Sequence, residues 1–330
     1  MPAVRKGKMN PFDRKLPKTD NSPQVAAILI ADFHLSHVPP VSRSAEKSWY
    51  AAMADPLRQI KDLVNKHKVP VICPGDVFDR WNSPPELINF ALVQLPKMYA
   101  VPGQHDLAHH RYNDIQKSAY WTLVKAGKIV NLEPESPVEV GEGGKALRLH
   151  GFPWGFPVKS LKNPDDLVLE IAVVHAYIWS KTTSYPGAPK EGHFRAVQKT
   201  ALGYHLVVSG DNHQPFLTGY KRDGKFPQIY NCGGLMRRKS DEKDRPCYAG
   251  LLWTNGEVTR VELDCSEDKW IDGKDTPIIE RGADMAEFLE ELSSLGDAAI
   301  DFADAIRRRL DQGDSPPNVR QILLEAMEKK

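Results

Sequence analysis

The chain has 330 residues, 41% of them hydrophobic, which is enough for one large globular domain and a smaller segment. Lys and Arg number 44 against 43 Asp and Glu, which excludes a general basic field that would hold nucleic acid by charge alone. No run of 18 apolar residues, signal-peptide pattern or C-x-x-C pair occurs, so we expect a cytoplasmic protein with reduced cysteines and no contact with a membrane.

A basic tail covers residues 1–24, and an alternation of short apolar runs and helical patterns follows it. Helical spacing of apolar residues predicts helices over roughly 45–66 and 85–95. The apolar runs have the length and β-branched content of buried strands. They cover 25–32, 69–76, 98–106, 169–175 and 204–213. This alternation is typical of an α/β fold.

A hairpin is predicted near residue 255, where the Asn255-Gly256 turn joins two strand-like runs over 247–254 and 257–264. Residues 25–265 therefore form the expected main domain, and the polar stretch 266–282 reads as a linker.

Residues 283–330 show three short helical patterns with 11 acidic and 6 basic side chains, a net charge of −5. That charge argues against a DNA-binding arm. Two interpretations stay open: a helical cap packed on the main domain, or a docking segment for a partner. Docking is favoured slightly, because 48 residues can hardly bury three apolar stripes by themselves.

Asp or His residues stand at the end of each of the five apolar runs. In open α/β sheets ligands bind outside the carboxyl ends of strands, so we expect the five loops to meet in one crevice. A single D-x-H pattern is a weak signal, but its repetition with other Asp and His blocks indicates a metal centre. The blocks are Asp32-Phe33-His34, Gly75-Asp76, Gly103-Gln104-His105-Asp106, His175 and Asp211-Asn212-His213.

At these blocks, residues 25–265 resemble the calcineurin-like metallophosphoesterase superfamily, whose pattern is D-x-H, G-D, G-N-H-D, a single H and G-H-x-H. The resemblance implies a four-layered α-β-β-α sandwich with a C-terminal helical segment and two divalent metal ions that hydrolyse phosphoesters. The Gly75–Asp79 block, the helical end and the Gly233–Arg238 stretch are most similar to the SbcD-type, phage-like subunit of a DNA repair nuclease. That similarity implies DNA as substrate and an SbcC-like ATPase bound through 283–330. It is also compatible with a homodimer.

The resemblance also implies a role for each block. Asp32, His34 and His213 match the ligands of one metal, and Asp76 matches the carboxylate that bridges both metals. Two such metals generate hydroxide and stabilise both oxygens of an in-line displacement at phosphorus.

The second metal's ligands fall at Gln104, His175 and Asp211, and two of these positions depart from the family pattern. Gln104 stands where Asn is usual, and Asp211 where His is usual. Both replacements keep an oxygen ligand, so we expect a retuned, harder site that favours Mn²⁺, with Mg²⁺ as the alternative. His105, paired with Asp106, matches the histidine that faces the scissile phosphate and can protonate the leaving oxygen.

Substrate contacts are expected beside these blocks. The candidates are His109, His110, Arg111, Tyr177 and Arg237. The first three could touch DNA phosphates and Tyr177 could stack on an unpaired base, with ordinary packing as its alternative. For Arg237 the alternative to phosphate contact is a solvated basic face.

The predicted function is metal-dependent hydrolysis of DNA phosphodiester bonds, as the exonuclease or endonuclease subunit of an SbcCD-like repair or recombination complex. A cytoplasmic phosphodiesterase or phosphatase acting on a nucleotide or phosphoprotein is the alternative enzyme. A scaffold that binds DNA ends or the partner without cutting is the alternative without catalysis. The sequence has no Walker A pattern, G-x-S-x-G or zinc-finger spacing that would favour another class.

Overall fold

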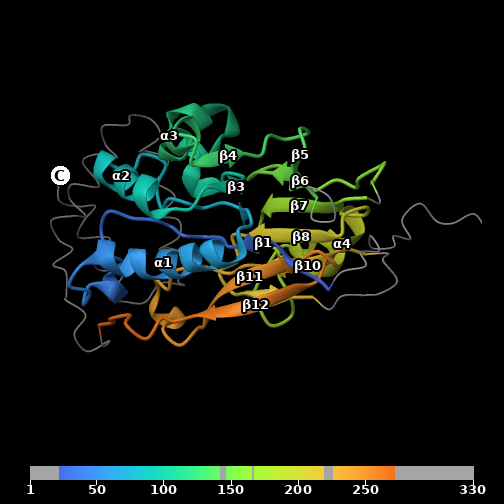
Figure 1. The fold of residues 1–330 in the computed structure, drawn as a ribbon. Coiled ribbons are helices and arrows are strands. Elements are labelled where there is room, and N and C mark those ends of the chain that lie inside the picture. Colours follow the sequence, from blue (N-terminus) through green and yellow to red (C-terminus); the bar gives the residue numbers. More distant parts are fainter. Residues whose placement is uncertain (1–21, 142–145, 166, 219–225, 272–330) are drawn as a thin grey trace, which may run out of the picture. The chain divides into compact units, whose positions relative to one another are not determined.

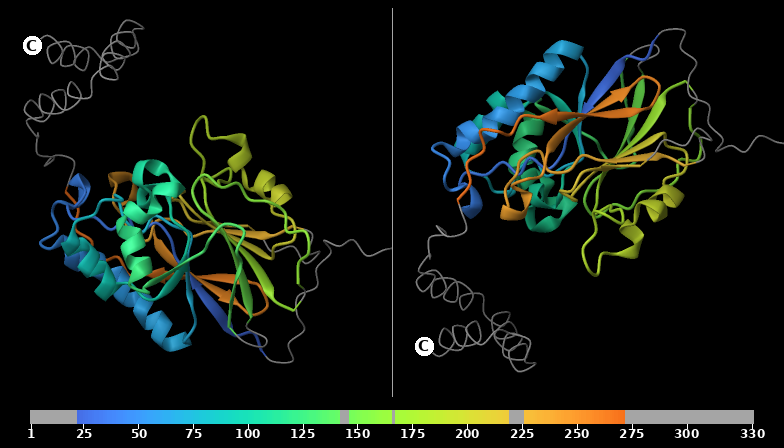
Figure 2. Two further views of the ribbon diagram at one scale, coloured as in Figure 1. Left: turned by 90° about the horizontal axis from the view of Figure 1, so that it is seen from above. Right: turned by 90° about the horizontal axis from the view of Figure 1, so that it is seen from below.

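The computed structural model describes residues 22–141, 146–165, 167–218 and 226–271. In this part of the chain two six-stranded sheets pack face to face, and helices cover the outer face of each sheet (Figures 1 and 2). The predicted α-β-β-α sandwich is therefore confirmed. The basic tail before residue 22 and the helical patterns of 283–330 lie outside the described residues, as does the linker after residue 271.

The first sheet has the order β12-β11-β1-β2-β3-β4. Its strands are β1 (Val25–Leu29), β2 (Val71–Cys73), β3 (Met98–Ala100), β4 (Ile129–Asn131), β11 (Cys247–Trp253) and β12 (Val258–Leu263). β1 to β4 run parallel, while β11 and β12 form the predicted antiparallel hairpin. β1 and β2 are buried on both faces, which explains why their sequences are continuous apolar runs.

The second sheet has the order β5-β6-β7-β8-β10-β9. Its strands are β5 (Val138–Val140), β6 (Leu147–Phe152), β7 (Leu169–His175), β8 (Leu206–Gly210), β9 (Phe216–Leu217) and β10 (Gln228–Asn231). β6, β7, β8 and β10 are parallel, and the antiparallel strands β5 and β9 close the edges. β7 and β8, two of the five predicted strands, therefore belong to a different sheet from β1, β2 and β3.

Among the described residues, three α-helices pack on the first sheet and one packs on the second. Figure 2 shows them on the outer faces of the sandwich. They are α1 (Trp49–His67), α2 (Pro85–Gln94), α3 (Ala119–Lys125) and α4 (Phe194–Thr200). Short 3₁₀ helices are η1 (Val41–Arg43), η2 (Gln104–Asp106), η3 (Ala108–His110), η4 (Tyr112–Lys117), η6 (Lys190–Gly192) and η7 (Ser240–Glu242).

Helix α1 shows how local sequence sets an element. The Ser48 hydroxyl accepts a hydrogen bond from Ala51 N, so the helix begins at Trp49 and not near residue 45. Met53, Leu57 and Ile60 recur at helical spacing, are fully buried, and pack on the first sheet.

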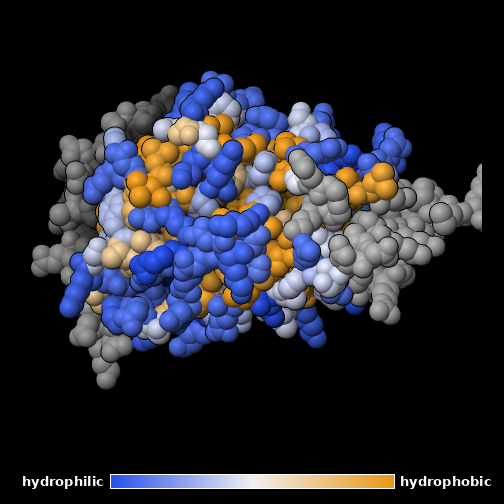
Figure 3. Space-filling model, viewed as in Figure 1, coloured by the Kyte–Doolittle hydropathy of each residue, from blue (hydrophilic) through white to orange (hydrophobic). Residues whose placement is uncertain are grey.

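The core lies in three apolar layers. The layer between the two sheets includes Leu29, Ile72, Leu149, Ile171 and Val208. The other layers lie between each sheet and its helices. The face seen in Figure 3 is mainly hydrophilic, with groups of hydrophobic residues between the hydrophilic ones. Within the described ranges no helix has the length and apolar character that a membrane span requires.

Candidate metal centre

The loops after β1, β2, β3, β7 and β8 meet at one place, as the strand-end pattern predicted. His34 Nε2 lies 3.0 Å from His213 Nε2, which joins a loop of the first sheet to a loop of the second. Asp76 Oδ2 lies 3.5 Å from His34 Nε2 and 3.4 Å from His175 Nε2. Side chains from both sheets therefore build a single cluster at the carboxyl ends of their strands.

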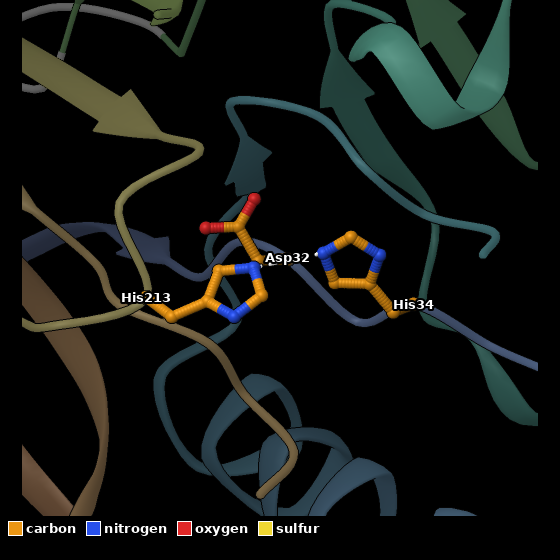
Figure 4. A group of neighbouring side chains, drawn as sticks. All are labelled: Asp32, His34 and His213. Carbon is orange, nitrogen blue, oxygen red and sulfur yellow. Dashed lines mark hydrogen bonds between the residues drawn. The ribbon is translucent and has the colours of Figure 1, made fainter. Parts of the chain in front are cut away.

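Asp32, His34 and His213 form one part of the cluster, and Figure 4 shows these three side chains pointing toward one another. Both Asp32 carboxylate oxygens accept from Asp211 N at 3.1 Å. Burial raises the pKa of Asp32 to about 7, against the opposing charges of His213 and His175. Burial also holds the pKa of His34 well below its usual range, which keeps the imidazole in the neutral form that a metal ligand requires.

Asp76, His175, Gln104 and Asp211 form the other part. His175 Nε2 lies 2.7 Å from Gln104 Oε1, and Gln104 Nε2 donates to Asp211 Oδ1 at 2.8 Å. Burial would raise the pKa of Asp76, but the charges of His175 and the neighbouring histidines together outweigh it and hold this pKa below its usual range. Burial would lower the pKa of His175, but Asp76 raises it to about 10. The cluster thus concentrates negative charge that a cation can neutralise.

Four of the predicted ligands have left-handed backbone, with φ of 51° at Asp32, 44° at His34, 52° at Asp76 and 73° at Asp211. This conformation is strained for residues with a side chain, and such strain gathers at functional sites. Gly75, which precedes Asp76, has φ of 106°, and a Cβ at this position would collide with the His175 ring. The loops are therefore built to bring these side chains together.

The residues present fit two divalent cations. Asp76 Oδ2 is buried and makes no hydrogen bond with any residue in the described part of the chain. Among the described residues, Asp76 also belongs to two of the three groups of potential ligands whose atoms lie within 4.8 Å of one another, as a bridging carboxylate would. Carboxylate, imidazole and amide oxygen donors suit Mn²⁺ and Mg²⁺ as well as Zn²⁺.

The pairing expected between His105 and Asp106 is not what the structure shows. The His105 Nδ1 atom lies 2.8 Å from the Asp79 carbonyl oxygen instead. The buried Asp106 carboxylate accepts from the backbone nitrogens of Val77, Phe78 and Gly103 at 2.9–3.1 Å. Asp106 therefore ties the loop after β2 to the loop after β3. Buried backbone N–H groups need hydrogen-bond acceptors, and the Asp106 carboxylate serves these three instead of the His105 ring.

A cavity of about 1020 Å³ opens at the cluster. Tyr177 lines it, and its contact with a substrate stays a prediction. Arg237 does not line it: its guanidinium group bonds Asp268 at 2.8 Å and the Cys265 carbonyl at 2.6 Å, so it holds the chain after β12 in place. The next residue, Arg238, lines the cavity and donates to Asp79 Oδ1 at 2.7 Å.

His109, His110 and Arg111 are exposed residues beside the Gln104 loop and do not line this cavity. His110 Nδ1 lies 3.0 Å from the Gln104 carbonyl oxygen, and Arg111 pairs with Asp114 at 2.5 Å. Their contact with a substrate stays a prediction.

Sequence reasoning missed three residues of the site: Asp79, Glu242 and Arg245. Asp79 falls within the Gly75–Asp79 block, so its spacing could have indicated it. Glu242 Oε1 lies 3.2 Å from His213 Nδ1, and Arg245 donates to the His213 carbonyl. These two residues follow His213 by 29 and 32 positions in a polar loop, and no motif pointed to them.

Solved structures that resemble the fold at low identity include the following three. They are the sulfate thiohydrolase SoxB of Thermus thermophilus in complex with glycerol (12% identity, TM-score 0.44), an archaeal phosphodiesterase (13%, 0.38) and a Staphylococcus aureus protein assigned as a 5′-nucleotidase, in complex with α-ketoglutarate (10%, 0.45). The matches cover 78%, 72% and 77% of this chain, and 60%, 99% and 57% of the respective structures. This chain thus spans less than two thirds of the first and third proteins. At these values none of the three informs on the substrate.

No curated protein matches the chain. The family model described as calcineurin-like phosphoesterase matches residues 26–215, which contain all the strand-end blocks. The strands, the converging loops and this match agree, and the chain belongs to the calcineurin-like phosphoesterase family.

Proposed function

We propose that the protein hydrolyses phosphodiester bonds in DNA with two divalent cations, Mn²⁺ foremost, as the nuclease subunit of an SbcCD-like complex. Membership of the family implies metal-dependent hydrolysis of phosphoesters. The choice of DNA as substrate is supported by the size and lining of the cavity.

The cavity exceeds the needs of a small phosphomonoester. Its volume of about 1020 Å³ stands at the upper end of the roughly 300–1,000 Å³ typical of small-molecule sites. Beyond the cluster its lining includes cationic and aromatic side chains, which are Arg238, Lys239, Arg245, Arg260, Tyr177 and Tyr248. The acidic residues Asp79, Asp241, Glu242 and Asp244 line it as well. Cationic groups can contact successive phosphates and tyrosines can stack on bases, which suits a polynucleotide.

Different residues of the site would carry out different parts of the reaction. Two cations held by the cluster would polarise the phosphoryl group and acidify the attacking water. The His105 Nδ1 atom lies against the Asp79 carbonyl and donates to it as N–H, which leaves Nε2 on the other edge of the ring for proton transfer. As the water oxygen bonds to phosphorus and the bond to the leaving oxygen breaks, protonated Nε2 gives that oxygen its proton.

The test is hydrolysis of labelled duplex and single-stranded DNA, an aryl phosphodiester and an aryl phosphomonoester by the purified protein with Mn²⁺. We expect DNA and the diester to be cleaved faster than the monoester. Asp76→Asn should lower every rate more than about 100-fold, since even residues behind the ligands of metal sites cost about 10–100-fold. Faster cleavage of the monoester would support the phosphatase alternative, and near-normal turnover by Asp76→Asn would contradict the two-metal assignment.

A further inference from the structure

Glu242 is a buried carboxylate next to the metal centre whose two oxygens are both engaged. The residue ends η7 and is 6% exposed. Its Oε1 lies 3.2 Å from His213 Nδ1, and its Oε2 accepts from Arg238 N at 2.6 Å and Lys239 N at 3.0 Å. Glu242 belongs to none of the groups of potential metal ligands among the described residues.

We propose that Glu242 is the positioning residue of the metal ligand His213. Histidines that bind metals through one ring nitrogen usually donate the other N–H to a carboxylate, which fixes the tautomer and ring orientation. Glu242 receives Nδ1–H in this way and leaves the His213 Nε2 lone pair directed toward His34 Nε2, 3.0 Å away. The carboxylate thereby prepares the imidazole to bind before any cation arrives.

A role confined to capping the helical turn η7 does not account for the contacts of both Glu242 carboxylate oxygens. Glu242 stands three residues after Lys239, and its Oε2 contact with Lys239 N is the capping interaction that begins a helical turn. Only Oε2 takes part in that cap, whereas Oε1 faces the imidazole. Arg245 from the same loop donates to the His213 carbonyl, so the loop holds both the ring and the backbone of this ligand.

The chain contains a matched pair away from the cavity. Glu170 on β7 is fully buried, and its Oε2 lies 2.7 Å from His150 Nε2. Neither residue lines the cavity or belongs to a metal-binding group among the described residues. Glu170→Gln therefore disturbs the same kind of carboxylate–imidazole contact without touching a ligand.

The experiment is calorimetric titration of the full-length chain with Mn²⁺ alone, together with thermal unfolding. We expect Glu242→Gln to weaken the tightest Mn²⁺ binding by about 10–100-fold, because the amide no longer accepts from Nδ1–H with a full charge. Glu170→Gln should lower the melting temperature but leave Mn²⁺ affinity unchanged. Unchanged affinity in folded Glu242→Gln protein, or an equal loss in both variants, would overturn the proposal.

If Glu242→Gln does not fold, Glu242→Asp takes its place as the test variant, because it keeps the charge and shortens the side chain by one methylene. It should also bind Mn²⁺ more weakly, and wild-type affinity in this variant would refute the positioning role. The inference rests on the metal-dependent function proposed above, but the titration needs no substrate. A protein that binds Mn²⁺ and leaves DNA intact would contradict the DNA substrate alone, and a wild type that binds no Mn²⁺ would contradict both.

Discussion

Gln104 and Asp211, the two residues that depart from the family pattern, contact each other. The Gln104 amide nitrogen donates to Asp211 Oδ1 at 2.8 Å, and its carbonyl oxygen faces His175 Nε2 at 2.7 Å. Asp211 therefore orients the Gln104 carbonyl oxygen toward the cluster. The two substitutions act as one change in the site, which a residue-by-residue comparison with the family pattern does not reveal.

Gln104 and Asp211 should set the metal preference of the site. Asp211→His removes a negative charge, so it should weaken Mn²⁺ and Mg²⁺ binding and improve the relative affinity for Zn²⁺, which imidazole suits better. Gln104→Asn keeps the charge and shortens the reach. Since the side chains are in contact, the double variant should show a coupling of about 0.5–3 kcal/mol in Mn²⁺ binding.

Titration of both single variants and the double variant with Mn²⁺, Mg²⁺ and Zn²⁺ measures these effects. An unchanged metal profile for Asp211→His would show that its carboxylate only orients Gln104. Strict additivity in the double variant would contradict the coupling.

At the scale of elements, Glu170 joins β7 to β6 within the second sheet. Its carboxylate lies 3.0 Å from the Arg148 guanidinium group and 2.7 Å from His150 Nε2, and both partners belong to β6. Burial would raise the pKa of Glu170, but the hydrogen bonds from His150 and Asp165 N outweigh it and lower this pKa below its ordinary value. The carboxylate therefore stabilises the folded state at pH values above the pKa it has when unfolded.

That stabilisation should be lost as the pH falls through the lower pKa of the folded state. Glu170→Gln should reduce the free energy of unfolding at pH 7 by about 1–3 kcal/mol, because charged hydrogen bonds of a buried group are replaced by weaker ones. Urea denaturation of wild type and variant measures the difference at neutral and acidic pH in the presence of chelator. A difference that does not shrink in acid would show that the charge of Glu170 is not its cause.

At the scale of the whole molecule, the described residues that line the cavity all lie between His34 and Arg260. Removal of residues 283–330 should therefore leave hydrolysis of an aryl phosphodiester near the wild-type rate. If that segment docks the SbcC-like ATPase, as we propose, the truncated chain should lose its partner. Co-purification of the ATPase with both chains tests this.

Full-length Asp76→Asn is the matched control for the truncation. It should retain the ATPase partner and lose hydrolysis, which is the opposite result. Equal recovery of the ATPase with the truncated and full-length chains would rule out docking through 283–330.

Much of this site could be predicted from the sequence because the motifs that indicate it are local. Each strand that supplies a ligand lies in a short apolar run with Asp or His at its end or in the loop that follows, and the hairpin turn at Asn255-Gly256 follows from two adjacent residues. The family pattern then gave the layered sandwich, which the structure confirms. Helix α1 begins four residues later than predicted, because the Ser48 cap sets its first turn.

Contacts between distant parts of the chain were decided only by the tertiary structure. Periodicity identifies β7 and β8 as strands but does not say that they form a second sheet, since sheet membership depends on which apolar faces pack together. Likewise Arg237 and Arg238 are neighbours in sequence, yet one bonds Asp268 and the other lines the cavity. The contact of Glu242 with His213 spans 29 residues. Strand-end chemistry thus follows from local sequence, whereas the groups that orient it depend on how the loops pack.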